Sequence, residues 1–99
     1  MKVEISPRAL REIERKAKSW ADHSTLSPDL FWEELESAGH RLEEDPLAGT
    51  RWVSPKGKAM LRLLMPRTEN HLYYTYDAKQ QLVRVWCIWG ARRGRAPRL

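Results

Sequence analysis

Residues 58–89 read KAMLRLLMPRTENHLYYTYDAKQQLVRVWCIW, and the prediction of the fold starts from them. It is rich in Leu, Tyr, Val, Ile and Trp, which are common in strands, and two short polar segments, PRTE and DAKQQ, interrupt it. Segments of this length commonly connect antiparallel strands. The stretch therefore predicts a meander of three strands, over residues 58–65, 70–77 and 82–89, with Trp52 and Val53 in a further strand fragment.

The chain before this meander is predicted to begin with a short strand at residues 2–5, followed by a helix. Ser6 and Pro7 form a favourable helix start, because the hydroxyl caps the first turn and proline needs no backbone hydrogen bond there. The helix is expected to reach about Asp22. Its apolar residues recur every three or four positions and are expected to face the core; they are Leu10, Ile13, Ala17 and Trp20.

A second helix is predicted to start at Ser27, Pro28 and Asp29, which repeat the first start signal, and to end before Pro46. The loop between the helices is short, which favours an antiparallel helical hairpin. The apolar stripe of the second helix is again expected to be core; it consists of Phe31, Leu35, Ala38 and Leu42.

This order of elements predicts an α+β fold, in which the helical hairpin packs on one face of a three- to four-stranded antiparallel β-meander. A chain of 99 residues has room for a single domain. We divide it into a strand and acidic hairpin (1–45), a basic antiparallel sheet (46–91) and a basic tail (92–99).

The charge is distributed unevenly between these parts. Residues 1–45 hold seven Lys or Arg and eleven Asp or Glu, a net charge of −4, whereas residues 46–99 hold eleven and two, a net charge of +9. Such asymmetry indicates a basic face for a polyanion, most often nucleic acid. The alternative is that the positive charge only keeps the protein soluble.

Other sequence features exclude several classes of protein. No apolar run approaches the length needed to cross a bilayer, and no signal peptide is expected, which favours a cytoplasmic protein. The single cysteine, Cys87, cannot form an internal disulfide and is expected to be a small buried apolar residue. His23, His40 and His71 have no metal-ligand spacing, and no glycine-rich phosphate loop is present, so we expect neither metal nor cofactor.

Alternation along the strands predicts which side chains face the helices. The set expected on the helix side is Ala59, Leu61, Leu63, Leu72, Tyr74, Tyr76, Val83, Val85, Cys87 and Trp89, with Met60, Thr75 and Ile88 among those facing away. A slip of one residue would invert this assignment. In the predicted register, the face turned away from the helices gathers Lys58, Arg62, His71, Tyr73, Arg84 and Trp86, with Arg92, Arg93 and Arg95 at its edge.

Such a face has cations for phosphates and rings for stacked bases. It also holds groups suited to RNA cleavage without a metal: His71 as the base or acid, and Lys58, Arg62 and Arg92 to stabilise the charged phosphorane. However, a lone histidine on a β-strand is more often a packing residue than a catalytic one. Arg62 and Arg84 could instead pair with acidic residues of the helices. These residues alone indicate a basic, nucleic-acid-facing domain.

Four segments together resemble the toxins of bacterial type II toxin–antitoxin pairs, the RelE/ParE superfamily. They are VEISPRALREI at the first helix, RLEEDPLAG after the second, LRLL and HLYYTYD in the middle strands, and VRVWCIWGARRG near the end. The resemblance implies a growth-inhibiting toxin neutralised by a cognate antitoxin. The antitoxin would be partly disordered and acidic, and the pair would bind operator DNA only through it.

RelE-like members are ribosome-dependent mRNA endonucleases, whereas ParE-like members inhibit DNA gyrase without cutting RNA. Lys58, Arg62 and Arg92 match the RelE pattern; Met60 stands where a second lysine is expected, and His71 replaces an arginine. No tyrosine follows Tyr76, so the C-terminal tyrosine of that pattern is missing.

The long helical hairpin and the HLYY strand resemble ParE more closely, although the basic tail lacks the acidic residue usual there. We favour the ParE-like interpretation, with a RelE-like nuclease and a nontoxic nucleic-acid-binding module as alternatives. The residues then expected to bind the target are Tyr73, Arg84, Trp86, Arg93 and Arg95.

Overall fold

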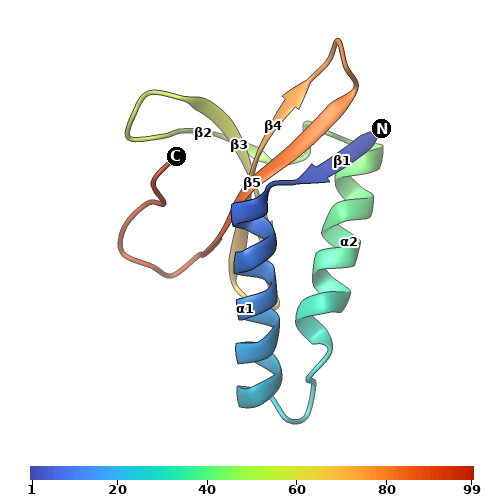
Figure 1. Ribbon diagram of the computed structural model, residues 1–99, viewed down its shortest axis with the longest axis vertical. Coiled ribbons are helices and arrows are strands. Elements are labelled where there is room, and N and C mark those ends of the chain that lie inside the picture. Colours follow the sequence, from blue (N-terminus) through green and yellow to red (C-terminus); the bar gives the residue numbers. More distant parts are fainter.

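The computed structural model describes all 99 residues, which form two helices and one five-stranded sheet (Figure 1). The elements lie close to the ranges expected from the sequence, and the α+β prediction is confirmed. In chain order they are β1 (Lys2–Ile5), α1 (Pro7–His23), α2 (Leu30–Glu44), β2 (Thr50–Val53), β3 (Ala59–Met65), β4 (Asn70–Asp77) and β5 (Leu82–Gly90).

The sheet is mixed, with strand order β1-β5-β4-β3-β2, and the prediction of a purely antiparallel meander is therefore wrong. Strands β2 to β5 are antiparallel to their neighbours, but β1 pairs parallel with β5, so that Val3 lies opposite Val83. This pairing covers the free edge of β5 with the start of the chain. The helical hairpin provides the long connection that returns the chain to the other side of the sheet.

The two helices begin differently. Ser6 caps α1 as predicted, since its hydroxyl oxygen accepts a hydrogen bond from the Ala9 N–H at 3.0 Å. The second helix begins at Leu30 with Asp29 at its cap position, two residues after the cap that the Ser27-Pro28 signal predicts. The carbonyl of Ser27 instead accepts hydrogen bonds from the Trp20 indole at 2.9 Å and the Leu30 N–H at 3.2 Å, so these residues close the loop between the helices.

The helices and one face of the sheet enclose the main hydrophobic core, which we call the inner core. Burial of this apolar area is the main stabilising contribution to such a fold. The inner core consists of Ala9, Ile13 and Ala17 from α1, Phe31, Ala38 and Leu42 from α2, and Leu63, Met65, Leu72, Tyr74, Val83, Val85 and Ile88 from the sheet.

A β-bulge at Trp86 changes the alternation along β5. Tyr73 and Tyr74 are consecutive in β4, yet they pair with Cys87 and Val85, which leaves Trp86 as the extra residue. Beyond the bulge, the prediction that Cys87 and Trp89 face the helices and Ile88 faces away is wrong. The fully buried Cys87 and the half-buried Trp89 pack on the opposite face, and Ile88 joins the inner core.

Two residues of the first helix region hold this bulge in place. The Ser6 hydroxyl donates to the Trp86 carbonyl at 3.1 Å. The carboxylate of Glu12 is buried and accepts a hydrogen bond from the Ile88 N–H at 3.1 Å and one from the Arg8 guanidinium at 3.3 Å. The bulge therefore depends on contacts between β5 and the helix packed beside it.

Candidate functional site

The face of the sheet turned away from the helices carries a second, smaller cluster, which we call the outer cluster. Its buried members are Met60, Tyr73 and Cys87, and four partly buried residues pack against them: Trp52, Trp86, Trp89 and Leu99. Strand pairing explains part of this set, because β2 aligns Trp52 with Met60 of β3. The Trp52 and Tyr73 rings meet edge to face with 4.6 Å between their centroids.

The outer cluster is covered by the tail, residues 91–99, which leaves β5 and folds back toward the hairpin of β2 and β3 (Figure 1). The Trp89 indole donates to the carbonyl of Arg95 at 2.8 Å, and the Arg8 guanidinium donates to the carbonyl of Arg98. Pro97 is fully buried, and Leu99 packs on the outer cluster. The tail thus crosses the basic face, where the sequence interpretation had placed its arginines only at the edge.

Between the tail and the strands lies a cavity of about 230 Å³, which we call the outer hollow. Each of four strands contributes at least one side chain, and the tail contributes the rest. The side chains that bear on its chemistry are Trp52 from β2, Arg62 from β3, His71 and Tyr73 from β4, Trp89 from β5, and Arg93 and Arg95 from the tail.

The outer hollow carries positive charge with no acidic partner from the chain. None of Arg62, Arg93 and Arg95 belongs to any of the salt bridges of the protein. The Arg93 guanidinium lies over the Trp89 ring, 3.7 Å from its centroid, which is a cation–π contact. The cavity therefore offers guanidinium groups to an anion beside aromatic rings.

His71 is the one residue of the hollow whose ordinary pKa lies near neutrality. Burial, and secondarily the charge of Arg62, lower the pKa of His71 below its usual value of 6.5. Its ring meets Tyr73 edge to face, with centroids 6.0 Å apart. The lowered pKa favours the uncharged imidazole, which can accept a proton and is the form that a general base requires.

The four residues predicted for RNA cleavage do not meet in one place. Arg62 and His71 line the outer hollow, but Lys58 lines a separate, smaller cavity with Trp86 and Leu99. Arg92 points elsewhere and forms a salt bridge with Glu69 at 2.8 Å. The structure therefore does not bring Lys58 and Arg92 into one cavity with His71; the chain turns after β5, where the Arg93 N–H donates to the Gly90 carbonyl at 3.3 Å.

The residues predicted to bind the target also separate. Arg93 and Arg95 line the hollow, and Tyr73 forms part of its wall but is only 3% exposed, so its ring cannot stack on a base. Arg84 lies outside the hollow and forms a salt bridge with Glu4 of β1 at 3.0 Å, which compensates the positive charge of Arg84. Trp86 also lies outside, where its indole donates to Thr75 at 2.9 Å.

Two residues of the hollow, Trp52 and Trp89, were missed by the sequence interpretation. Trp52 lay in a fragment too short to be assigned a face, and the strand bulge moved Trp89 from the helix side to the outer side. The antiparallel pairing of β2 with β3 is the signal that could have placed Trp52 opposite Met60.

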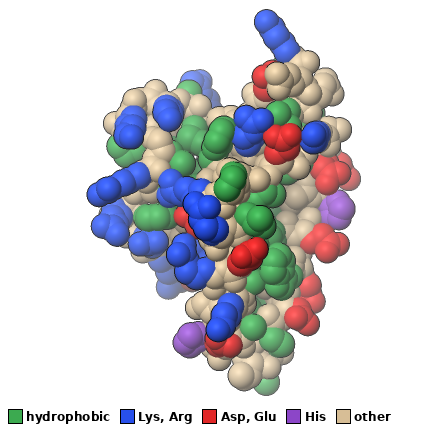
Figure 2. Space-filling model, in the orientation of Figure 1, with side chains coloured by type: hydrophobic (Ala, Val, Ile, Leu, Met, Phe, Trp, Pro, Cys, Tyr) green, Lys and Arg blue, Asp and Glu red, His purple; other side chains and the backbone are tan.

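The space-filling view shows how charge is distributed over one side of the molecule (Figure 2). Lys and Arg side chains gather over the tail and the hairpin of β2 and β3, whereas Asp and Glu side chains line the opposite edge, along α2. The asymmetry in the sequence is therefore also an asymmetry in space. No cluster of three His, Cys, Asp or Glu side chains that could hold a metal ion is present.

Comparisons with known proteins leave the chain without an assigned family. No family model, no curated protein and no solved structure matches it. Neither helix combines the length with the apolar character needed to span a membrane.

Proposed function

We propose that this chain is the growth-inhibiting toxin of a bacterial type II toxin–antitoxin pair, of the RelE/ParE kind, and that it acts by binding its target in the cytoplasm. The order of a short strand, a helical hairpin and a basic antiparallel meander supports this proposal. The observation that carries it is the outer hollow, in which Arg62, Arg93 and Arg95 remain without acidic partners. Arg62 is half-buried, where an unpaired charge is costly unless a partner compensates it, and the exposed Arg93 and Arg95 add further positive charge beside it.

Binding without cutting, as in ParE-like gyrase inhibition, is favoured because two of the predicted catalytic residues do not line the outer hollow. The positions that match the RelE catalytic pattern, Lys58 and Arg92, lie outside it. The cognate antitoxin, which the family resemblance implies to be partly disordered and acidic, would neutralise the toxin by covering the same positive surface.

A second candidate function, RelE-like cleavage of mRNA on the ribosome, is favoured by His71. A neutral imidazole beside Arg62 is suited to take the proton of a ribose 2′-hydroxyl, while the guanidinium stabilises the charge that develops on the phosphorane. In that case Arg93 takes the place that the sequence pattern gives to Arg92.

Growth inhibition tests the proposal with two adjacent arginines as a matched pair. Arg93→Ala removes a charge from the hollow and is expected to abolish growth inhibition, whereas Arg92→Ala removes an equal charge outside it and is expected to leave inhibition unchanged. Both variants should fold, because each alters exposed charge rather than packing. Full toxicity of Arg93→Ala at equal protein level would contradict the proposal, and an untoxic parent protein would favour the nontoxic nucleic-acid-binding module.

The two mechanisms are separated by pulse labelling of DNA, RNA and protein synthesis after induction, with transcript ends mapped in parallel. Gyrase inhibition stops DNA synthesis first and leaves transcripts intact, and His71→Gln then remains toxic. Cleavage stops translation first, cuts transcripts within codons, and is lost in His71→Gln because glutamine cannot accept the proton.

A further inference from the structure

A second cationic cavity lies on the other side of the tail, next to the first turns of α1. We call it the tail pocket; its volume is about 350 Å³, and it is lined by Arg8, Trp89, Arg95, Ala96 and Arg98. Three of these residues, Trp89, Arg95 and Ala96, also line the outer hollow. The two cavities are therefore neighbours with the tail as their shared wall.

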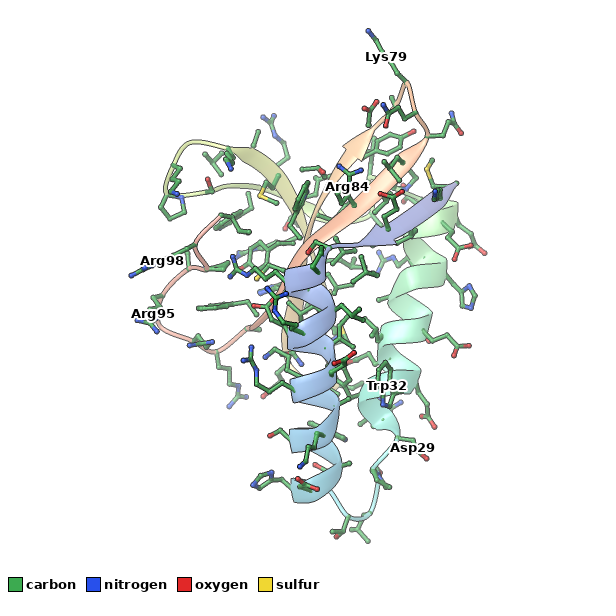
Figure 3. The ribbon with its side chains drawn as sticks, in the orientation of Figure 1. Asp29, Trp32, Lys79, Arg84, Arg95 and Arg98 are labelled. Carbon is green, nitrogen blue, oxygen red and sulfur yellow. The ribbon has the colours of Figure 1, made fainter.

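The tail is held by its backbone, which leaves its arginine side chains free. The hydrogen bonds from Trp89 and Arg8 end on the main-chain carbonyls of Arg95 and Arg98. The guanidinium groups of Arg95 and Arg98 themselves take part in no salt bridge. Figure 3 shows both side chains projecting from the tail on the side facing away from the helices.

Positive charge continues beyond the tail pocket, to Lys16 and Arg93, which do not line it. Lys16 of α1 is half-buried, and its pKa is lowered by that burial and then by the charge of Arg93. The carboxylate of Glu12, whose charge acts on Lys16, already accepts hydrogen bonds from Arg8 and from the Ile88 N–H. A ligand with negative charge would compensate the unpaired guanidinium groups of Arg95 and Arg98, and guanidinium groups bind phosphate oxygens in a bidentate manner.

We propose that the tail pocket is a phosphate-binding subsite, and that single-stranded nucleic acid lies across the tail with its backbone running from the outer hollow into this pocket. The aromatic rings decide between nucleic acid and an acidic peptide. Trp52 and Trp89 lie among the arginines of the outer hollow, and rings between cations suit unstacked bases joined by phosphates. This inference goes beyond the proposed toxin activity, because such binding requires no toxicity.

Fluorescence anisotropy with a labelled single-stranded DNA of about twelve nucleotides tests the subsite, since DNA cannot be cut through a 2′-hydroxyl. The variant Arg95→Ala with Arg98→Ala is expected to bind roughly tenfold more weakly at low salt. The slope of log affinity against log salt concentration is expected to become shallower by about 1.4, the value for two lost phosphate contacts on a single strand.

The matched control is Arg41→Ala with Lys79→Ala, which removes the same charge from exposed residues of α2 and of the turn between β4 and β5. It is expected to change affinity by less than about threefold. An equal loss in both double variants would mean that only net charge matters and would overturn the proposal. The proposal would also be overturned if a glutamate-rich peptide of similar charge bound the parent protein more tightly than the DNA does, and if this binding depended more strongly on Arg95 and Arg98.

Discussion

The two faces of the sheet are both apolar, but they are covered in different ways. Two helices cover the inner face and bury a core of 13 residues, whereas nine residues of tail cover the outer face, where three residues are buried. Helices supply a continuous apolar surface, so the inner core is close-packed, and the cavity of about 390 Å³ on that side lies between α2 and β3. The tail supplies mainly Pro97 and Leu99, and cationic cavities remain on both sides of it. The thin cover of the outer face therefore leaves cavities that are lined by arginines of the tail.

Alanine substitutions on the two faces should give the largest difference. Leu72→Ala in the inner core is expected to lower the free energy of unfolding by about 2–5 kcal/mol, because a residue 2% exposed leaves a cavity between rigid elements. Met60→Ala in the outer cluster should cost less than about 2 kcal/mol, because the tail can close on the space. Urea unfolding measures both, and equal losses would show that the tail is packed as rigidly as the helices.

Removing the Glu12 carboxylate should have an intermediate effect, since this group joins the two faces at the bulge. Glu12→Ala leaves the buried Ile88 N–H without its acceptor and is expected to cost about 1–3 kcal/mol. Glu12→Gln keeps an acceptor and should cost less, and the exposed Glu14→Ala should change stability by less than about 0.5 kcal/mol. Hydrogen exchange at the Ile88 amide reports the same contact, and unchanged protection in Glu12→Ala would contradict its role.

The smallest effect is expected from the titration of His71 on the outer face. Because its folded-state pKa lies below 6.5, the unfolded chain binds the proton more readily, and stability is lost as the pH falls through 6.5 toward the folded-state pKa. The His71→Gln variant should lack this component. Unfolding at about pH 7.5 and about pH 5.5, compared between the two proteins, measures it; parallel pH profiles would contradict the assigned shift.

Residues on uninterrupted strands were predictable from the sequence, because alternation alone decides their side. Leu63 and Leu72 face the helices, and Arg62 and His71 face away on adjacent strands, as expected. Alternation failed at Trp86, since the bulge there is fixed by Ser6 and Glu12, both more than 70 positions away in the chain. The sequence of β5 alone contains no pattern that predicts these hydrogen bonds to Ser6 and Glu12.

Which residues line the site was harder to predict from the sequence than which residues form the strands. Arg92 and Arg93 are adjacent and chemically identical, yet one pairs with Glu69 and the other lines the outer hollow. The difference arises from the path of the tail, which Arg8 and Trp89 hold through hydrogen bonds. The parallel pairing of β1 was not predicted for a similar reason, because its partner strand, β5, is far from it in the sequence.

The way in which the tail is anchored has a consequence for its evolution. Arg8 and Trp89 bond to main-chain carbonyls, which every amino acid provides, so the path of the loop does not depend on which side chains occupy positions 95 and 98. Those positions can accumulate substitutions while the backbone keeps its course. Mutations confined to these few codons therefore change what this surface recognises, with the sheet and the helices untouched.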